Sequence, residues 1–191
     1  MTTFLAQITD LHIREPGRLA YGRLDTAPYL RAAVDAVKRL RQKPHALVLT
    51  GDLTDFGTAG EYAHLAELLA PLEGELPIYL LPGNHDERDQ LRRSFAHHAY
   101  LPDTEFVQYT VGIGPKDSHG LQLVCLDTVQ AGQGAGRLCE KRLRWLDDEL
   151  TRLSGQPVVV AMHHPPFATF IGHMDRLGLV EGGDEFQRIL A

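Results

Sequence analysis

Four short apolar runs in this chain are each followed at once by residues that can ligate a metal ion. These residues, taken in chain order, are Asp10, His12, Asp52, Asn84 and His163. A strand followed by an Asp or a His is common, and any one case alone is typical of a turn or a cap. Four such cases in one chain are hard to reach by chance. The pattern therefore favours a fold that gathers four strand ends in one place.

Apolar runs alternate with helical patterns along the chain, an order typical of α/β layering around a largely parallel sheet. The runs predict strands over 4–8, 46–50, 78–81, 106–111, 121–126 and 158–162. The 106–111 and 121–126 strands are expected to pair antiparallel. The helical patterns cover 27–40, 60–70, 87–98, 142–153 and 184–190. Because ligands bind at the carboxyl ends of the strands in such sheets, the residues above fall where a site is expected.

Length and composition are those of one globular domain over 1–191. The chain has 191 residues, 43% of them apolar, which is enough for one sizeable core. Proteins that bind long nucleic acids usually show a basic patch, whereas the formal charge here is −6. We therefore expect no nucleic acid polymer as a partner.

Membrane and export signals are also not seen in the sequence. No apolar run approaches the ~20 residues that span a bilayer, and the start lacks the basic region and cleavage pattern of a secretory signal. The two cysteines have no CxxC spacing and are expected to be reduced. The expectation is a cytoplasmic protein without a membrane partner.

The first two groups of ligand residues have a geometric reason. In an extended segment residues i and i+2 point the same way, so Asp10 and His12 are predicted to bind one ion while Leu11 points into the core. Asp52 has two carboxylate oxygens and can bridge two ions. Gly51 before it leaves room for a close backbone approach.

The chemistry of the ligands predicts the ions and the reaction. Asn84 offers an amide oxygen and His163 a nitrogen to a second ion. Imidazole and oxygen together suit Fe, Mn, Zn or Co better than Ca or Mg. Two divalent ions carry about +4 and the two carboxylates return −2, so the centre would attract a phosphate ester. Two divalent or mixed-valence ions ~3.5–4 Å apart can form a bridging hydroxide and clamp a phosphoryl oxygen.

Two further polar residues lie close to these ligands in the sequence. His85 follows Asn84 directly and is the predicted catalytic residue, contacting the phosphate or protonating the leaving oxygen. A structural loop histidine is the alternative. Asp55 lies three residues past Asp52 and either supports a ligand or caps a helix.

The motifs resemble the signature of the calcineurin-like metallophosphoesterase superfamily, which reads D-x-H, G-D, G-N-H-[DE], a later H and a final G-H-x-H. The first four blocks are present in order as D-L-H, G-D, G-N-H-D and the histidine at 163. The chain is similar over nearly its whole length to the bacterial class III cyclic nucleotide phosphodiesterase branch, which also includes glycerophosphodiesterases. That likeness rests on "LPGNHD" at 81–86, "MHHPPF" at 162–167 and "GHMDRLGL" at 172–179.

The resemblance implies a fold and a division of ligands. The fold would be a four-layer α/β/β/α metallophosphoesterase sandwich. Asp10, His12 and Asp52 would hold one metal, and Asp52 would share the other with Asn84 and His163.

The resemblance also bears on the histidines around the ligands. His164 would pack against or support His163. His12, Asn84 and His85 would contact the substrate, and His173, in the "HMD" stretch, is either a substrate contact or an ordinary loop histidine.

The closing G-H-x-H of the family is absent from these 191 residues, which contain no H-x-H. The resemblance implies that each metal lacks one ligand here. We expect a C-terminally incomplete domain, without the strand and the G-H-x-H segment that follow in the family. A fragment of a longer chain is favoured over a natural short form with a damaged centre.

The expected function is hydrolysis of a small phosphodiester, a 3′,5′-cyclic nucleotide first, by a metal-bridging hydroxide. Alternatives within the class are a glycerophosphodiester or a broad-specificity phosphodiesterase. A catalytically impaired binding protein is a further alternative, because two ligands are missing. A nuclease would need a basic stripe, and a solvated helical face explains Arg88, Arg92 and Arg93 equally well. The branch often forms dimers, which leaves a homodimer open.

Overall fold

The computed structural model describes residues 2–114 and 120–191 of the chain. Strands and helices alternate as the sequence predicts. In chain order the elements are β1 (Leu5–Ile8), α1 (Ala27–Arg39), β2 (Ala46–Thr50), α2 (Ala59–Leu69), β3 (Ile78–Leu81), α3 (Arg88–Ser94), β4 (Tyr109–Ile113), β5 (Leu121–Cys125), β6 (Gly136–Arg137), α4 (Glu140–Arg152), β7 (Val158–Ala161), α5 (Gly172–Leu177), β8 (Leu179–Glu181) and α6 (Gly183–Leu190).

Two three-stranded sheets form the centre of the molecule. The first has the order β1-β2-β3, and both of its pairings are parallel. The second has the order β4-β5-β7, in which β4 and β5 pair antiparallel, as predicted, and β5 and β7 pair parallel. A short parallel pair of β6 and β8 forms a separate two-stranded sheet.

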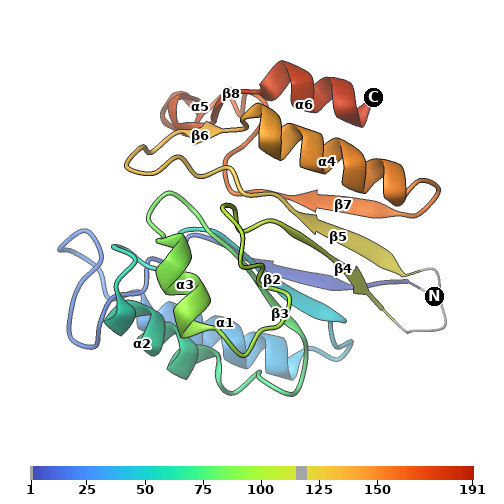
Figure 1. Ribbon diagram of the computed structural model, residues 1–191. Coiled ribbons are helices and arrows are strands. Elements are labelled where there is room, and N and C mark those ends of the chain that lie inside the picture. The colour runs from blue at the N-terminus through green and yellow to red at the C-terminus, as the bar shows by residue number, and fades with distance from the viewer. Residues whose placement is uncertain (1, 115–119) are drawn as a thin grey trace.

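The helices cover the outer faces of the two sheets, which gives the expected α/β/β/α sandwich (Figure 1). Helices α1, α2 and α3 lie on the side of the first sheet, and α4 and α6 on the side of the second. The two faces of β5 show the layering. Leu123 and Cys125 belong to the apolar core that includes the first sheet, whereas Val124 packs with Leu146 of α4 and Phe186 of α6. Successive side chains of a strand point to opposite faces, so one strand serves both cores.

Local sequence signals explain where the first two helices begin. Helix α1 has a proline in its first turn, where no intrahelical hydrogen bond is lost, and basic residues in its last turn. Helix α2 begins with a capping box. The Thr58 side chain accepts from the Glu61 N–H, and the Glu61 carboxylate accepts from the Thr58 N–H.

The structure corrects several element boundaries. Helix α3 ends at Ser94, well before the predicted end at residue 98, so His97 and His98 lie in the turns that follow it. Strand β4 begins three residues later than predicted, since the Val107 N–H donates to the Asp127 carboxylate at 2.9 Å and not to a neighbouring strand. The short elements α5, β6 and β8 carry too few residues to show a periodicity, and they were not predicted.

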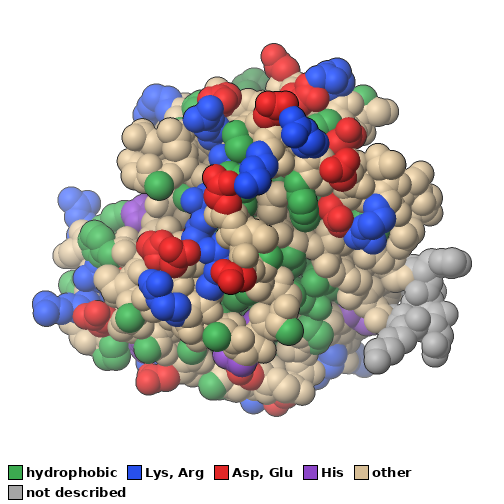
Figure 2. All heavy atoms as spheres, in the orientation of Figure 1, with side chains coloured by type: hydrophobic (Ala, Val, Ile, Leu, Met, Phe, Trp, Pro, Cys, Tyr) green, Lys and Arg blue, Asp and Glu red, His purple; other side chains and the backbone are tan. Residues whose placement is uncertain are grey.

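The surface of the described residues gives little information about the class of partner. In the described ranges no helix combines the length and the apolar character needed to cross a membrane. The face shown in Figure 2 carries Lys and Arg side chains interspersed with Asp and Glu. Cys125 is buried and Cys139 is half-buried, and both are free thiols.

Candidate metal centre

The loops after β1 and β2 are joined by backbone hydrogen bonds. The Asp10 N–H donates to the Gly51 carbonyl at 3.1 Å, and the His12 N–H donates to the Asp52 carbonyl at 2.9 Å. These bonds bring the two loops together just past the carboxyl ends of neighbouring parallel strands. The ligand atoms of Asp10, His12 and Asp52 all lie within 4.8 Å of one another.

The backbone at this place differs from the one that the sequence suggested. Asp10, His12 and Asp52 all have positive φ, at 56°, 43° and 47°. The segment is therefore not extended, and the i, i+2 argument for pairing Asp10 with His12 was wrong. Leu11 is nevertheless buried, as predicted. Left-handed backbone at non-glycine residues is costly and tends to be kept at functional sites.

The Asp52 carboxylate lies between two histidines, one following a strand of the first sheet and one following a strand of the second. Its Oδ2 is 3.6 Å from His12 Nε2, and its Oδ1 is 3.4 Å from His163 Nε2. The Asn84 Oδ1 is 3.3 Å from the same nitrogen of His163. His163 Nδ1 donates to the Thr50 carbonyl at 2.9 Å, which orients the ring with Nε2 toward the carboxylate and the amide.

Two glycines make this close packing feasible. A Cβ on Gly51 would lie 2.4 Å from His163 Nδ1, and a Cβ on Gly83 would lie 2.2 Å from the Asp52 nitrogen. Real Cβ atoms do not approach other atoms so closely. The room that the sequence predicted beside Gly51 therefore exists, and Gly83 provides a second example.

The protonation of the cluster follows from burial and from these pairs. Burial alone would raise the pKa of Asp52, but the hydrogen bond and the charge of His163 hold that pKa below its usual value. Burial would lower the pKa of His163, but the hydrogen bond and the charge of Asp52 outweigh burial, so the pKa of His163 is raised. The pKa of His12 is lowered, because the effect of burial exceeds that of the neighbouring carboxylates. The opposite shifts at Asp52 and His163 show that positive charge is favoured next to the Asp52 carboxylate, and a bound cation would supply such charge.

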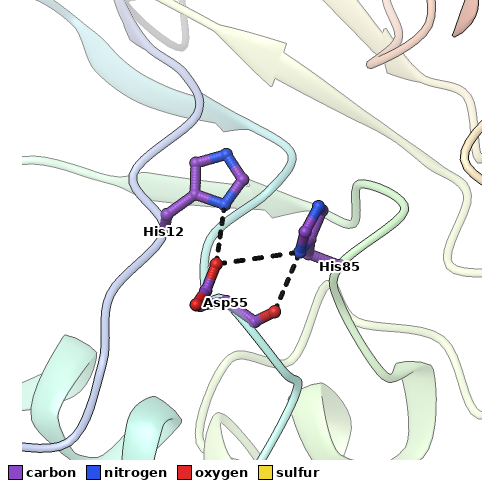
Figure 3. A group of neighbouring side chains, drawn as sticks. All are labelled: His12, Asp55 and His85. Atoms are coloured by element: carbon purple, nitrogen blue, oxygen red, sulfur yellow. Dashed lines mark hydrogen bonds and ion pairs between the residues drawn. The ribbon is translucent and has the colours of Figure 1, made fainter. Parts of the chain in front are cut away.

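Asp55 supports two histidines of the cluster (Figure 3). Its Oδ1 lies 3.5 Å from His12 Nδ1, and its backbone carbonyl accepts from His85 Nδ1 at 2.8 Å. It caps no helix, since α2 begins with the capping box of Thr58. The sequence left two interpretations of Asp55 open, and the geometry favours the one in which it supports a ligand, His12.

His85 is fixed at one end and open at the other. Its backbone N–H donates to Asp52 Oδ1 at 3.0 Å, and its ring packs edge-on against the ring of His12, with 4.7 Å between the centroids. With Nδ1 bonded to Asp55 and 29% of the side chain exposed, Nε2 is available to a substrate.

Two residues of the site were not predicted from the sequence. The Tyr21 hydroxyl is 2.9 Å from His12 Nε2. Tyr21 itself is an exposed loop residue with a φ of 52°. Asp86 is buried, and its carboxylate accepts from the N–H groups of Leu53 and Gly83 and from the Tyr62 hydroxyl. Burial raises the pKa of Asp86 to about 6 against these hydrogen bonds. The acidic end of the G-N-H-D block was the available signal for Asp86, whereas nothing in the sequence marked Tyr21.

The two later histidines have different surroundings. His164 is buried, with Nδ1 accepting from the Thr128 hydroxyl at 2.7 Å and Nε2 donating to the Gly134 carbonyl at 3.2 Å. It packs beside His163, as the resemblance implied, at 4.8 Å between ring centroids. His173 is exposed on α5, and the structure does not bring it into the acid-and-histidine groups found among the described residues.

Comparisons with known proteins identify a family and several relatives of the chain. A model of the family described as calcineurin-like phosphoesterase matches residues 5–190. A probable glycerophosphodiester phosphodiesterase of Arcobacter nitrofigilis is 31% identical, over 97% of this chain and 66% of its own length. A glycerophosphodiester phosphodiesterase of Enterobacter lignolyticus is 29% identical, over 93% of this chain and 62% of its own length. A probable cyclic nucleotide phosphodiesterase of Rhodococcus erythropolis is 30% identical, over 85% of this chain and 52% of its own length. The chain thus spans between about half and two thirds of the length of these relatives.

Proposed function

This chain belongs to the calcineurin-like phosphoesterase family, and on that basis we propose that it hydrolyses a small phosphodiester, with a 3′,5′-cyclic nucleotide as the first candidate. One observation carries the proposal. The Asp52 carboxylate turns one oxygen to His12 and the other to His163, which is the placement that a carboxylate shared by two ions requires. Phosphodiester hydrolysis is a reaction that two-metal sites perform.

The residues present fit a pair of metal ions. Asp10, His12 and Asp52 would hold one ion, and Asp52 would share the other with Asn84 and His163. The carboxylate, imidazole and amide donors suit Fe, Mn, Zn or Co. When bound, the ions would supply Lewis acidity and a water of lowered pKa.

The protein's own groups orient the ligands and handle a proton. The Thr50 carbonyl fixes the ring of His163, and the Asp55 carbonyl fixes that of His85. Because His85 Nδ1 donates to that carbonyl, the imidazolium form carries its second proton on Nε2. We assign to this nitrogen the protonation of the leaving oxygen, or a hydrogen bond to the phosphate.

The substrate class rests on the relatives and on charge. The relatives are named as cyclic nucleotide or glycerophosphodiester phosphodiesterases, and both substrate types are small diesters. The net charge of −6 does not favour a polyanion. His12, Asn84 and His85 surround the position proposed for the phosphate, and His173 is proposed as a contact from α5.

One observation favours a second candidate, a phosphoesterase-like protein that binds its ligand without turnover. Residues 1–191 contain five of the seven ligand positions that the resemblance implies, and no H-x-H. The metal content separates the two candidates, since a binding protein with a damaged centre would be folded and nearly free of metal. The intact mass of the protein against its reading frame shows whether further ligands belong to it.

Hydrolysis assays test the proposal. The protein, loaded with Mn²⁺, is given 3′,5′-cyclic AMP, a glycerophosphodiester and bis(p-nitrophenyl) phosphate. The proposal predicts release of the monoester from at least one of them and loss of the activity with a chelator. Metal-loaded protein that cleaves none of the three would overturn it.

A further inference from the structure

A second group of ligand-type side chains lies at the opposite end of β3 from the candidate metal centre around Asp52. Asn84 of that centre lies shortly after the carboxyl end of β3. Glu73, from the turn after α2, and His97 and His98, from the turns after α3, line a cavity with Ile78, the first residue of β3. The two groups therefore share no ligand.

The three side chains point their donor atoms at one another. Glu73 Oε1 lies 3.3 Å from His97 Nε2 and 3.6 Å from His98 Nε2. One donor atom from each residue lies within 4.8 Å of the other two. The group thus offers two imidazole nitrogens and one carboxylate oxygen around a common point.

The two distances from Glu73, 3.3 and 3.6 Å, are close to those between ligands of a tetrahedral ion. Ligands at the 2.0–2.1 Å typical of zinc lie about 3.3–3.4 Å apart across a tetrahedral angle. The His97 contact is also short enough for a hydrogen bond, but the 3.6 Å contact of His98 is too long for one. We propose that Glu73, His97 and His98 form a second metal site, which binds Zn²⁺ or a similar transition-metal ion independently of the catalytic centre.

The surroundings of His98 support the proposal. Its Nε2 is buried and has no hydrogen-bond partner in the described part of the chain, a state that costs free energy unless something binds there. The ring is held by its neighbours, with centroids 4.3 Å from the His97 ring, 5.6 Å from Phe95 and 5.3 Å from Tyr100. The nitrogen is therefore fixed where an ion would use it.

The cavity gives the ion an open side. It has a volume of about 480 Å³ and is lined by all three donors together with Tyr79 and Tyr100. A water can complete the coordination there, as in zinc sites with three protein ligands. Two imidazoles with one carboxylate favour zinc, copper, nickel or cobalt over magnesium and calcium, which prefer oxygen donors.

Matched variants of the whole chain test this site. Glu75 lines the same cavity and pairs with Lys38, so Glu75→Gln is the control for Glu73→Gln. Equilibrium dialysis against Zn²⁺ counts the ions bound per chain, and the catalytic centre contributes equally to every variant. We expect Glu73→Gln and His97→Ala each to bind one ion fewer than the wild type or to bind it at least tenfold more weakly, with Glu75→Gln unchanged.

The same dialysis can overturn the proposal. If Glu73→Gln and His97→Ala bind as many ions as Glu75→Gln, with unchanged affinity, the group is not a metal site. Glu73→Gln keeps the shape of an exposed side chain, so it remains informative if His97→Ala unfolds, which thermal unfolding by circular dichroism reveals. Hydrolysis of bis(p-nitrophenyl) phosphate is expected to be unchanged in Glu73→Gln, which distinguishes this site from the proposed catalytic one.

Discussion

The Oδ1 of Asp52 lies 3.4 Å from the Nε2 of His163, although Asp52 follows a strand of the first sheet and His163 follows a strand of the second. The candidate centre is therefore built across both sheets. Its ligands come together only when the two sheets pack face to face. Changes that loosen this packing should weaken metal binding even where they touch no ligand.

Asp55 is predicted to affect activity by orienting His12 and His85. Replacing it with Asn keeps the backbone carbonyl that fixes His85 but removes the charge beside His12 Nδ1. Groups that orient metal ligands typically contribute 10–100-fold to affinity or activity, so we expect kcat/KM to fall by about that factor. Asp89→Asn, at an exposed acid on α3, is the control and should keep wild-type kcat/KM. Equal values for the two variants would contradict the role given to Asp55.

His85 is predicted to act on the substrate without holding metal. His85→Ala should lower kcat by about 10²–10⁴-fold, the usual contribution of general acid catalysis. Its metal content, measured by plasma mass spectrometry, should equal that of the wild type. If the metal is lost together with the activity, His85 has a structural role in the centre.

Gly83 is predicted to accept no side chain. A Cβ there would meet the backbone nitrogen of Asp52 at 2.2 Å, and backbone cannot move aside cheaply. We expect Gly83→Ala to lower the free energy of unfolding by about 1–3 kcal/mol, the usual cost of overpacking. Gly112→Ala is the matched control, because its nearest atom would be 3.7 Å away at the end of a glutamine side chain. Urea unfolding that finds the two variants equally stable would refute the close approach.

His164 is predicted to make the protein sensitive to acid. Burial and the neighbouring His163 lower the pKa of His164 to about 4, whereas an unfolded histidine titrates near 6.5. Above about pH 6.5 His164 is neutral in both the folded and the unfolded chain, so it does not change the stability there. As the pH falls from about 6.5 to 4 the unfolded chain takes up a proton that the folded chain does not, so stability falls by up to about 3 kcal/mol.

Urea unfolding at pH 7.5 and pH 4.5, in the presence of a chelator, measures this loss. The wild type should lose more stability on acidification than His164→Gln, which lacks the titrating ring. Parallel losses in the two proteins would show that His164 is not the group responsible.

The sequence allowed the order of the elements to be predicted, and also the residues that the structure brings together around Asp52, because both depend on local patterns. Apolar runs followed by polar residues are visible without a structure, and so is the capping box of Thr58. The conformation at Asp10 and His12 was not predictable in this way. It depends on hydrogen bonds to Gly51 and Asp52, which are distant in the chain.

Contacts made between distant loops explain the other misses. Tyr21 reaches His12 from an exposed turn, and no spacing or periodicity marks it. Helix α3 was predicted too long, since 95–98 has helical composition but the chain turns there to place His97 and His98 beside Glu73. In each case a tertiary contact decides what a local pattern leaves open.

The central claim is a phosphodiesterase centre organised around Asp52, and the most direct test is hydrolysis of bis(p-nitrophenyl) phosphate by wild type and Asp52→Asn. Both proteins are first stripped of metal with a chelator and then supplied with Mn²⁺. The account predicts that Mn²⁺ restores hydrolysis in the wild type and that Asp52→Asn stays more than about 100-fold slower, since a lost ligand costs more than a lost supporting group. Equal rates in the two proteins, or hydrolysis by the stripped wild type without added metal, would contradict it.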